Sequence, residues 1–198
     1  MLYNFSIKVV WIIMHILFRI DIKGQENIPS DGAIVCPNHY NVIDPVLIAI
    51  CIPKRKIRFM AKHEVFKNPI ANFYLRRVGV YPVRRGEPDL NSIKTTLKIL
   101  KENALVGLFP EGTRSKTGEL GPANPGVALF AIKSGKPVIP VAITGRYRLF
   151  SRVKVSFGQP LDLVQYKKDK MTNDDYYETS QLVMDQIRQL KGDAACKL

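Results

Sequence analysis

A histidine and an aspartate five positions apart offer the clearest catalytic chemistry in the sequence. His39 and Asp44 lie in a segment, residues 38–45, that follows an apolar stretch typical of a buried strand and precedes a helical pattern. In open α/β sheets, ligands bind at such strand-to-helix loops. An imidazole can take the proton of a hydroxyl group while a carboxylate fixes its tautomer and stabilises the imidazolium. The spacing and the location therefore predict a general base with its orienting partner.

Each of these two residues also has a simpler interpretation. Asp44 followed by Pro45 is a good helix N-cap sequence that requires no catalytic role. A single histidine would ordinarily be a structural residue held by backbone hydrogen bonds. Capping and catalysis are compatible, so it is the two residues together, in this loop, that favour catalysis.

Two arginines mark the end of a second apolar segment. The segment begins at Gly79 and ends in Arg84 and Arg85. The planar guanidinium fork of arginine suits the oxygens of a phosphate group. Two adjacent cations are equally compatible with a solvated strand end, and this segment alone does not decide between the two.

A third polar cluster follows the apolar segment 104–110. Gly112 allows the backbone to turn sharply and to approach a ligand closely. Arg114 could hold a second phosphate oxygen, and Glu111 could hold that arginine or a substrate hydroxyl. The alternative is a polar turn with an internal Glu–Arg pair.

The elements that must position these clusters alternate between strand-like and helical patterns. Apolar strand-like segments occupy residues 33–37, 57–61, 78–83, 104–110 and 138–143. Helical patterns that open with a proline or with Asp and Asn cap types occupy residues 45–52, 69–77, 90–102 and 125–134, and should cover the sheet. Residues 153–157 alternate as an edge strand would, and residues 173–191 have the period of a last helix. The pattern predicts one α/β domain with a mixed, mostly parallel sheet covered by helices.

Composition supports a folded domain with a strongly basic surface. The 198 residues suit one domain, and 46% hydrophobic with 24% charged residues is a globular balance. A net charge of +13 should attract polyanions such as anionic lipid headgroups, phosphorylated substrates or nucleic acid, although many lysines also simply keep a chain soluble. Nucleic acid is disfavoured because the sequence contains no recognisable binding motif and no aromatic residues interleaved with the basic ones. A serine hydrolase is disfavoured because no G-x-S-x-G motif occurs.

The three cysteines, Cys36, Cys51 and Cys196, are odd in number and lack metal-type spacing. This predicts a reducing compartment and no metal site. Cys36 lies three residues before His39, where a nucleophile is conceivable. A small buried strand residue is the simpler interpretation.

The N-terminal segment, residues 5–20, contains an apolar stretch that is flanked by Lys8 and Arg19 and interrupted by His15. It is short for a spanning helix, which needs about 20 apolar residues. No small-residue cleavage site follows, so secretion is disfavoured. The alternative to a membrane role is a helix packed on the protein's own core. Trp11, the basic flanks and the net charge favour an amphipathic helix in the headgroup region, residues 1–20, followed by the main domain, residues 21–198.

Four blocks of the sequence resemble those of the glycerolipid acyltransferase family, in particular the 1-acylglycerol-3-phosphate acyltransferases. His39 and Asp44 match the family's HxxxxD pair with its preceding Asn38, and residues 79–85 resemble its phosphate-binding block. Residues 109–115 match the FPEGTRS block, and residues 138–141 match the final apolar block. The resemblance covers roughly residues 24–160. Tyr81 and Pro82 depart from the bulkier apolar pairs of many relatives, so acceptor preference does not follow from the resemblance.

The resemblance implies a reaction and a division of roles. His39, oriented by Asp44, would deprotonate the free hydroxyl of 1-acylglycerol-3-phosphate, which then attacks an acyl thioester of coenzyme A or acyl carrier protein to give phosphatidic acid, with no metal or other cofactor. A scaffold that has lost activity is disfavoured because the key side chains are intact. The enzyme would work on an anionic membrane surface, at the cytoplasmic face of the cell membrane, as a peripheral or monotopic protein. The acceptor's phosphate would be held by Arg85, by its neighbour Arg84, by Arg114 and by Lys62. The pocket would be shaped by Asn38, Glu111, Gly112 and Thr113.

Overall fold

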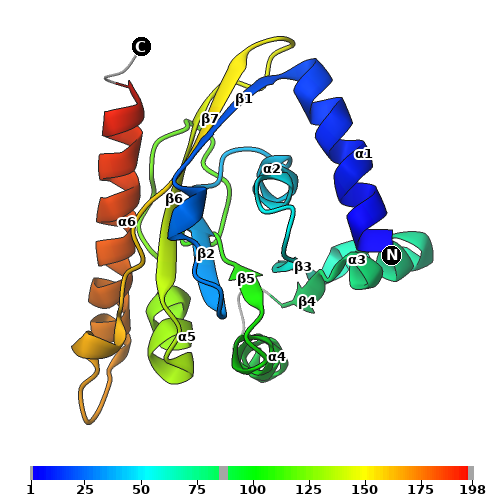
Figure 1. Cartoon of the computed structure of the whole chain (residues 1–198). Coiled ribbons are helices and arrows are strands. Elements are labelled where there is room, and N and C mark those ends of the chain that lie inside the picture. The colour runs from blue at the N-terminus through cyan, green and yellow to red at the C-terminus, as the bar shows by residue number, and fades with distance from the viewer. Residues whose placement is uncertain (1, 85–88, 196–198) are drawn as a thin grey trace.

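A computed structural model describes residues 2–84 and 89–195 of the chain. Within them, seven strands form one sheet with the order β1-β7-β6-β2-β5-β3-β4 (Figure 1). The strands are β1 (Arg19–Lys23), β2 (Ala33–Pro37), β3 (Ile57–Lys62), β4 (Tyr81–Val83), β5 (Leu105–Gly107), β6 (Val138–Gly145) and β7 (Arg152–Phe157). Strands β2 to β6 are mutually parallel, while β7 runs antiparallel to β6 and parallel to β1. The predicted α/β domain with a mixed, mostly parallel sheet is confirmed.

Helices cover both faces of this sheet. They are α1 (Leu2–Leu17), α2 (Asp44–Cys51), α3 (Pro69–Val78), α4 (Leu90–Lys101), α5 (Gly126–Ser134) and α6 (Asn173–Ala195). Short 3-10 turns occur at Gln25–Asn27, His63–Lys67 and Val164–Tyr166. Figure 1 shows α1 and α2 on one side of the sheet and α4, α5 and α6 on the other. The predicted helices α2 to α6 are each found within a few residues of their expected bounds.

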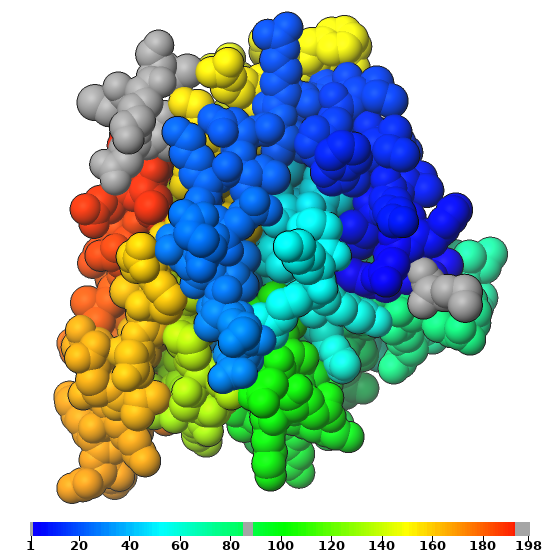
Figure 2. All heavy atoms as spheres, viewed as in Figure 1, coloured from blue at the N-terminus to red at the C-terminus, as the bar shows by residue number. Residues whose placement is uncertain are grey.

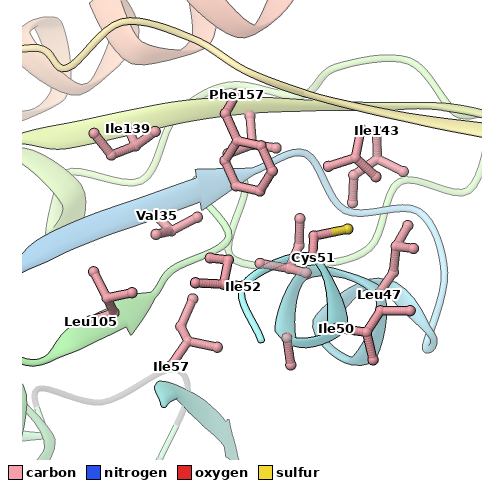
Figure 3. Packing of buried hydrophobic residues seen from close by; sticks show 14 of the residues in the cluster. Val35, Leu47, Ile50, Cys51, Ile52, Ile57, Leu105, Ile139, Ile143 and Phe157 are labelled. Atoms are coloured by element: carbon pink, nitrogen blue, oxygen red, sulfur yellow. The ribbon is translucent and has the colours of Figure 1, made fainter. Parts of the chain in front are cut away.

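Each face of the sheet carries its own hydrophobic core. On the α1 and α2 side, Leu47 and Ile50 of α2 belong to the same buried cluster as Val35 of β2 and Ile139 of β6, and Figure 3 shows side chains of this cluster between α2 and the strands. The second core, on the opposite face, involves α4, α5 and α6. Burying a side chain of this size contributes about 1.5–3 kcal/mol to the stability of the fold. The buried side chains of α2 therefore hold this helix against the sheet.

Three details of the fold differ from the sequence-based expectations. Strand β7 was expected at an edge, but it lies between β1 and β6. Its alternating pattern reflects one apolar and one polar face, and says nothing about whether its edges are paired. Helix α3 does not cover the sheet: it buries no residue and lies beside α1 and the turn at His63–Lys67. It extends through Val78 and ends at Gly79, which has φ +94, so β4 begins later than expected.

Helix α1 lies along the surface and still belongs to the packed domain. It ends at Leu17, three residues earlier than expected, because Arg19 and Ile20 already pair with β7. Met14 of α1 and Phe18 after it are buried in the first core. Figure 2 shows α1 in dark blue against α2 in cyan. The helix therefore has an inner side that is part of the core and an outer side at the surface.

Candidate active site

The ends of the parallel strands bring the predicted site residues to one edge of the sheet. His39 follows β2, and β2 pairs with both β5 and β6. Glu111 follows β5, and Tyr147 follows β6. Because the carboxyl ends of parallel strands meet at the same edge, segments far apart in sequence converge around His39.

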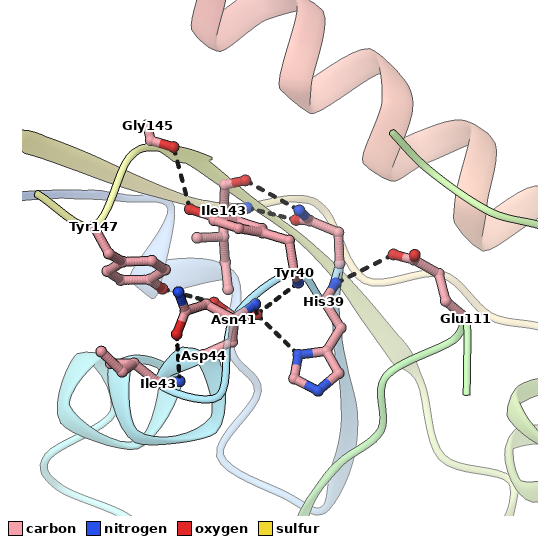
Figure 4. A network of polar contacts seen from close by, with 10 residues as sticks. His39, Tyr40, Asn41, Ile43, Asp44, Glu111, Ile143, Gly145 and Tyr147 are labelled. Atoms are coloured by element: carbon pink, nitrogen blue, oxygen red, sulfur yellow. Dashed lines mark hydrogen bonds and ion pairs between the residues drawn. The ribbon is translucent and has the colours of Figure 1, made fainter. Parts of the chain in front are cut away.

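His39 and Asp44 form the expected pair. The Nδ1–H of His39 donates a hydrogen bond of 2.8 Å to Oδ2 of Asp44 (Figure 4). A carboxylate only accepts hydrogen bonds, so Nδ1 carries the proton of the neutral ring and Nε2 is free to take one. Asp44 is fully buried and His39 is 9% exposed. This is the geometry of a general base with an orienting carboxylate.

Asp44 accepts hydrogen bonds from the loop before it and does not cap the helix that it begins. Its Oδ2 also accepts the backbone N–H groups of Tyr40 at 2.8 Å and Asn41 at 2.7 Å. Its Oδ1 accepts the hydroxyl of Tyr147 at 2.7 Å. The N-cap position of α2 is Ile43, which makes no side-chain cap, so the capping interpretation of Asp44 is wrong. The carboxylate instead folds the loop around itself and fixes the His39 ring.

The loop after β5 fastens the backbone of His39 on both sides. The His39 N–H donates to Oε1 of Glu111 at 3.2 Å, and the N–H of Ser115 donates to the His39 carbonyl at 2.8 Å. The ring of Phe109 stacks on the imidazole with 3.9 Å between centroids and 24° between planes. Phe109 lies in the recognised FPEGTRS block, although its stacking role was not predicted. This loop thus positions the base in addition to shaping a pocket.

Glu111 is a partly buried carboxyl group with an altered acidity. Burial raises the pKa of Glu111, and the hydrogen bond from the His39 backbone N–H partly offsets that rise. Within the described residues, Glu111 and Arg114 make no ion pair, so the internal Glu–Arg turn considered from the sequence is not formed. Glu111 faces His39 instead.

A pocket of about 500 Å³ lies beside the His39–Asp44 pair, between the ends of β3, β4 and β5 and the helices α4 and α5. Phe109 and Glu111 line this pocket, and both also contact His39. Its apolar lining includes Met60, Val83, Ile93, Leu108, Phe109, Val127 and Phe130. Its polar lining includes Arg84, Asp89, Ser92, Glu111, Thr113 and Asn124. A pocket lined by both apolar and polar side chains suits an amphiphilic ligand.

The remaining predicted site residues divide into three groups. Arg84, Gly112 and Thr113 line the pocket. Arg114 and Lys62 do not line the pocket: Arg114 is exposed, and Lys62 forms an ion pair with Glu64 at 3.3 Å. Arg85 lies outside the described residues.

Asn38 has a role that differs from pocket lining. Its side-chain N–H donates to the Ile143 carbonyl at 3.1 Å, and its oxygen accepts the Ile143 N–H at 2.7 Å. This exchange ties the end of β2 to β6 directly before His39. Asn38 therefore contributes to the site by fixing its frame.

The structure argues against a cysteine nucleophile. Cys36 is fully buried in β2, and this burial raises the pKa of its thiol well above the usual range. A buried thiol of raised pKa is a poor nucleophile. The small buried strand residue considered from the sequence fits Cys36, and Cys196 lies outside the described residues. In the part of the chain that the structure describes, no three His, Cys, Asp or Glu side chains are grouped as a metal site would require.

Helix α1 presents large apolar side chains to solvent on its outer side. Phe5 is 67% exposed, Ile12 52% and Ile16 64%. These positions are seven and four residues apart and so share one helical face. In the described part of the chain, no helix combines the length and the apolar character that crossing a bilayer requires.

Tyr147 contacts Asp44 through its side chain and was not predicted from the sequence as a site residue. It lies six residues beyond the last recognised block, in the turn between β6 and β7. A signal existed, because β6 is the neighbour of β2 and a polar aromatic residue after such a strand falls at the same edge of the sheet. Burial and the charge of Asp44 raise the pKa of Tyr147, so its hydroxyl remains a proton donor.

Comparisons with known proteins agree with this geometry. The Acyltransferase family model matches residues 19–144. A 1-acyl-sn-glycerol-3-phosphate acyltransferase of Bacillus subtilis is 32% identical over 166 residues, covering 81% of this chain and 82% of the relative. A chloroplastic enzyme of the same name from Brassica napus is 33% identical over 132 residues, which cover 65% of this chain and 38% of the longer plant protein. The crystal structure of the 1-acyl-sn-glycerophosphate (LPA) acyltransferase of Thermotoga maritima shares the fold, with a TM-score of 0.70 at 24% identity over 96% of this chain and 81% of that one.

Proposed function

The chain belongs to the acyltransferase family, and from that membership we propose that it transfers a fatty acyl group from a thioester to the sn-2 hydroxyl of 1-acylglycerol-3-phosphate, giving phosphatidic acid. The names of the relatives from Bacillus subtilis and Brassica napus support this acceptor. The observation that carries the mechanism is the hydrogen bond between His39 and the buried carboxylate of Asp44. The donor is an acyl thioester of coenzyme A or of acyl carrier protein.

His39 acts as the general base in this reaction. The acceptor's hydroxyl proton moves to Nε2 of His39 while the hydroxyl oxygen forms a bond to the thioester carbonyl carbon. Asp44 stabilises the resulting imidazolium through its bond to Nδ1. The tetrahedral intermediate then collapses, the carbon–sulfur bond breaks, and the imidazolium proton passes to the departing thiolate. His39 is thereby returned to its neutral form.

The pocket beside the pair accommodates an amphiphilic substrate. Its apolar side chains suit an acyl chain, and its polar side chains suit a phosphoglycerol group. Arg84, which lines the pocket, is proposed to bind the acceptor's phosphate together with Arg85, since the guanidinium group can bind two phosphate oxygens at once. Arg114 and Lys62, which do not line the pocket, would have to reach the phosphate from outside it.

We also propose that the enzyme works as a peripheral protein on an anionic membrane surface at the cytoplasmic face of the cell membrane. The exposed side chains of Phe5, Ile12 and Ile16 on α1 support this, because an apolar helix face gains free energy by entering the headgroup region. Leu149 and Phe150, in the turn that bonds to the end of α1, are also exposed. The net charge of +13 adds attraction to anionic lipids.

The reaction is tested with purified protein, a panel of lysophospholipids and both thioester donors. Phosphatidic acid and free thiol should appear in equal amounts when 1-acylglycerol-3-phosphate is the acceptor. Thiol release that is independent of any acceptor would instead indicate a thioester hydrolase. Salt-sensitive DNA binding without acyl transfer would favour a nucleic-acid-binding protein.

The membrane surface is tested by substitution, because deleting α1 would also remove the buried Met14. The triple variant Phe5→Ser, Ile12→Ser, Ile16→Ser should weaken sedimentation with anionic phospholipid vesicles by at least roughly 10-fold. A matched control, Tyr177→Ser with Leu182→Ser, removes exposed apolar side chains from α6, on the far side of the molecule in Figure 1. Equal loss of binding in both variants would refute α1 as the contact.

A further inference from the structure

The turn between β6 and β7 supplies a side chain to the buried carboxylate of the catalytic pair. Tyr147 donates its hydroxyl to Oδ1 of Asp44 at 2.7 Å, while Oδ2 accepts Nδ1–H of His39. We propose that Tyr147 is a positioning residue for acyl transfer: its hydroxyl holds the Asp44 carboxylate in the orientation that serves His39. The expected effect on acyl transfer rests on the proposed function, whereas the hydrogen bond between Tyr147 and Asp44 does not depend on it.

The tyrosine ring is held from two sides. It meets Phe18 edge to face, with ring centroids 5.6 Å apart and 79° between planes, and it lies 5.5 Å from the ring of Tyr40. The turn that carries it is fastened to the end of α1, since the Phe150 N–H donates to the Leu17 carbonyl at 2.7 Å. A hydroxyl on a ring fixed in this way can define the direction of a carboxylate, which a mobile donor cannot do.

The hydrogen bond also affects how strongly Asp44 attracts a proton on His39. A neutral donor withdraws negative charge from the carboxylate, and removing the donor strengthens the attraction between Asp44 and a protonated imidazole. Among the residues that the structure describes, Tyr40 and Glu111 are the other titratable groups with an interaction to the pair, and a change at Tyr147 leaves both in place. Loss of the hydroxyl should therefore favour the protonated His39 and reduce the fraction of base that is ready to react.

The variant Tyr147→Phe separates positioning from packing, because phenylalanine keeps the ring contacts and removes only the hydroxyl. We expect kcat to fall about 10-fold with KM for the acceptor unchanged. The acid limb of the kcat/KM profile should move to higher pH by roughly half a unit or more. The control is Tyr3→Phe, which removes a partly buried tyrosine hydroxyl that accepts the Ile57 backbone N–H at 3.3 Å and should leave that limb in place.

A second readout requires no turnover. The chain contains three histidines, so NMR titration of the imidazole signals follows His39 with His15 and His63 as internal references. In Tyr147→Phe the His39 midpoint should rise while the other two stay unchanged. An unmoved midpoint and an unmoved acid limb would overturn the proposal even if kcat fell, because the hydroxyl would then serve folding alone. If the wild-type protein transferred no acyl group, the proposed function would fail, and the NMR midpoint would still decide the role of Tyr147.

Discussion

Replacing Asp44 by asparagine tests the electrostatic part of the mechanism with little disturbance of the fold. With its oxygen in place of Oδ2, asparagine still accepts the bonds from His39 Nδ1 and from the backbone N–H groups of Tyr40 and Asn41. The amide nitrogen then replaces Oδ1, and its N–H can donate a hydrogen bond to the Tyr147 hydroxyl oxygen once the hydroxyl proton rotates away. The side chain thus remains satisfied, and the change is the loss of one negative charge beside the imidazole.

The structure sets the scale of that loss. A unit charge about 4 Å from the developing imidazolium contributes about 4 kcal/mol at an effective dielectric constant near 20. At 1.36 kcal/mol per tenfold change in rate, this corresponds to a decrease in kcat of about 10³-fold. The assay follows thiol release and phosphatidic acid together, over at least four decades of rate.

Stability provides the control for this variant. The neutral amide weakens charge-assisted hydrogen bonds but avoids burying a charge, so Tm should fall by less than about 8 °C, at roughly 2–4 °C per kcal/mol. A folded Asp44→Asn protein with turnover within threefold of wild type would refute the assignment of Asp44 as the partner of the base.

Three further predictions concern Glu111, Cys36 and Arg85. Burial raises the pKa of Glu111, so the native state binds its proton more readily than the unfolded chain does, and stability should fall as pH rises from the ordinary carboxyl range through the raised pKa. Glu111→Gln removes that dependence and should flatten the curve of Tm against pH in this window, whereas an equally steep curve would contradict the burial argument. Cys36→Ala should retain acyl transfer within about threefold at a cost of about 1 kcal/mol in stability, and an inactive but folded variant would revive a cysteine nucleophile. Arg85→Ala should raise KM for the acceptor by about 10- to 100-fold with little change in kcat, and an unchanged KM would count against its phosphate role.

The hydrogen-bonded pairing of His39 with Asp44 could be predicted from the sequence because its signals are local. His39 and Asp44 lie in one short loop, and an apolar strand pattern before it with a helix after it places that loop at the ligand-binding edge of the sheet. The strand and helix patterns likewise predicted the α/β class. Periodicity reports which face of an element is apolar, but it does not show what that face packs against, and α3 was wrongly expected to cover the sheet.

Other features depend on contacts between distant segments, and these the sequence did not reveal. The position of β7 inside the sheet depends on its pairing with β1, more than 100 residues earlier. The true partners of Asp44 include Tyr147, 103 residues away, which no local pattern connects to it. The stacking of Phe109 on His39 similarly depends on the pairing of β2 with β5. Local propensity therefore suggested that Asp44 caps its helix, and the tertiary hydrogen bonds decided otherwise.

The most direct test of the account is the rate of acyl transfer by His39→Ala with 1-acylglycerol-3-phosphate and an acyl thioester. Loss of the general base should lower kcat by about 10²- to 10⁴-fold, while circular dichroism and Tm show a folded protein, because the backbone hydrogen bonds of residue 39 to Glu111 and Ser115 do not depend on the imidazole ring. A folded His39→Ala protein that transfers acyl groups at the wild-type rate would contradict the central claim that His39 removes the acceptor's proton.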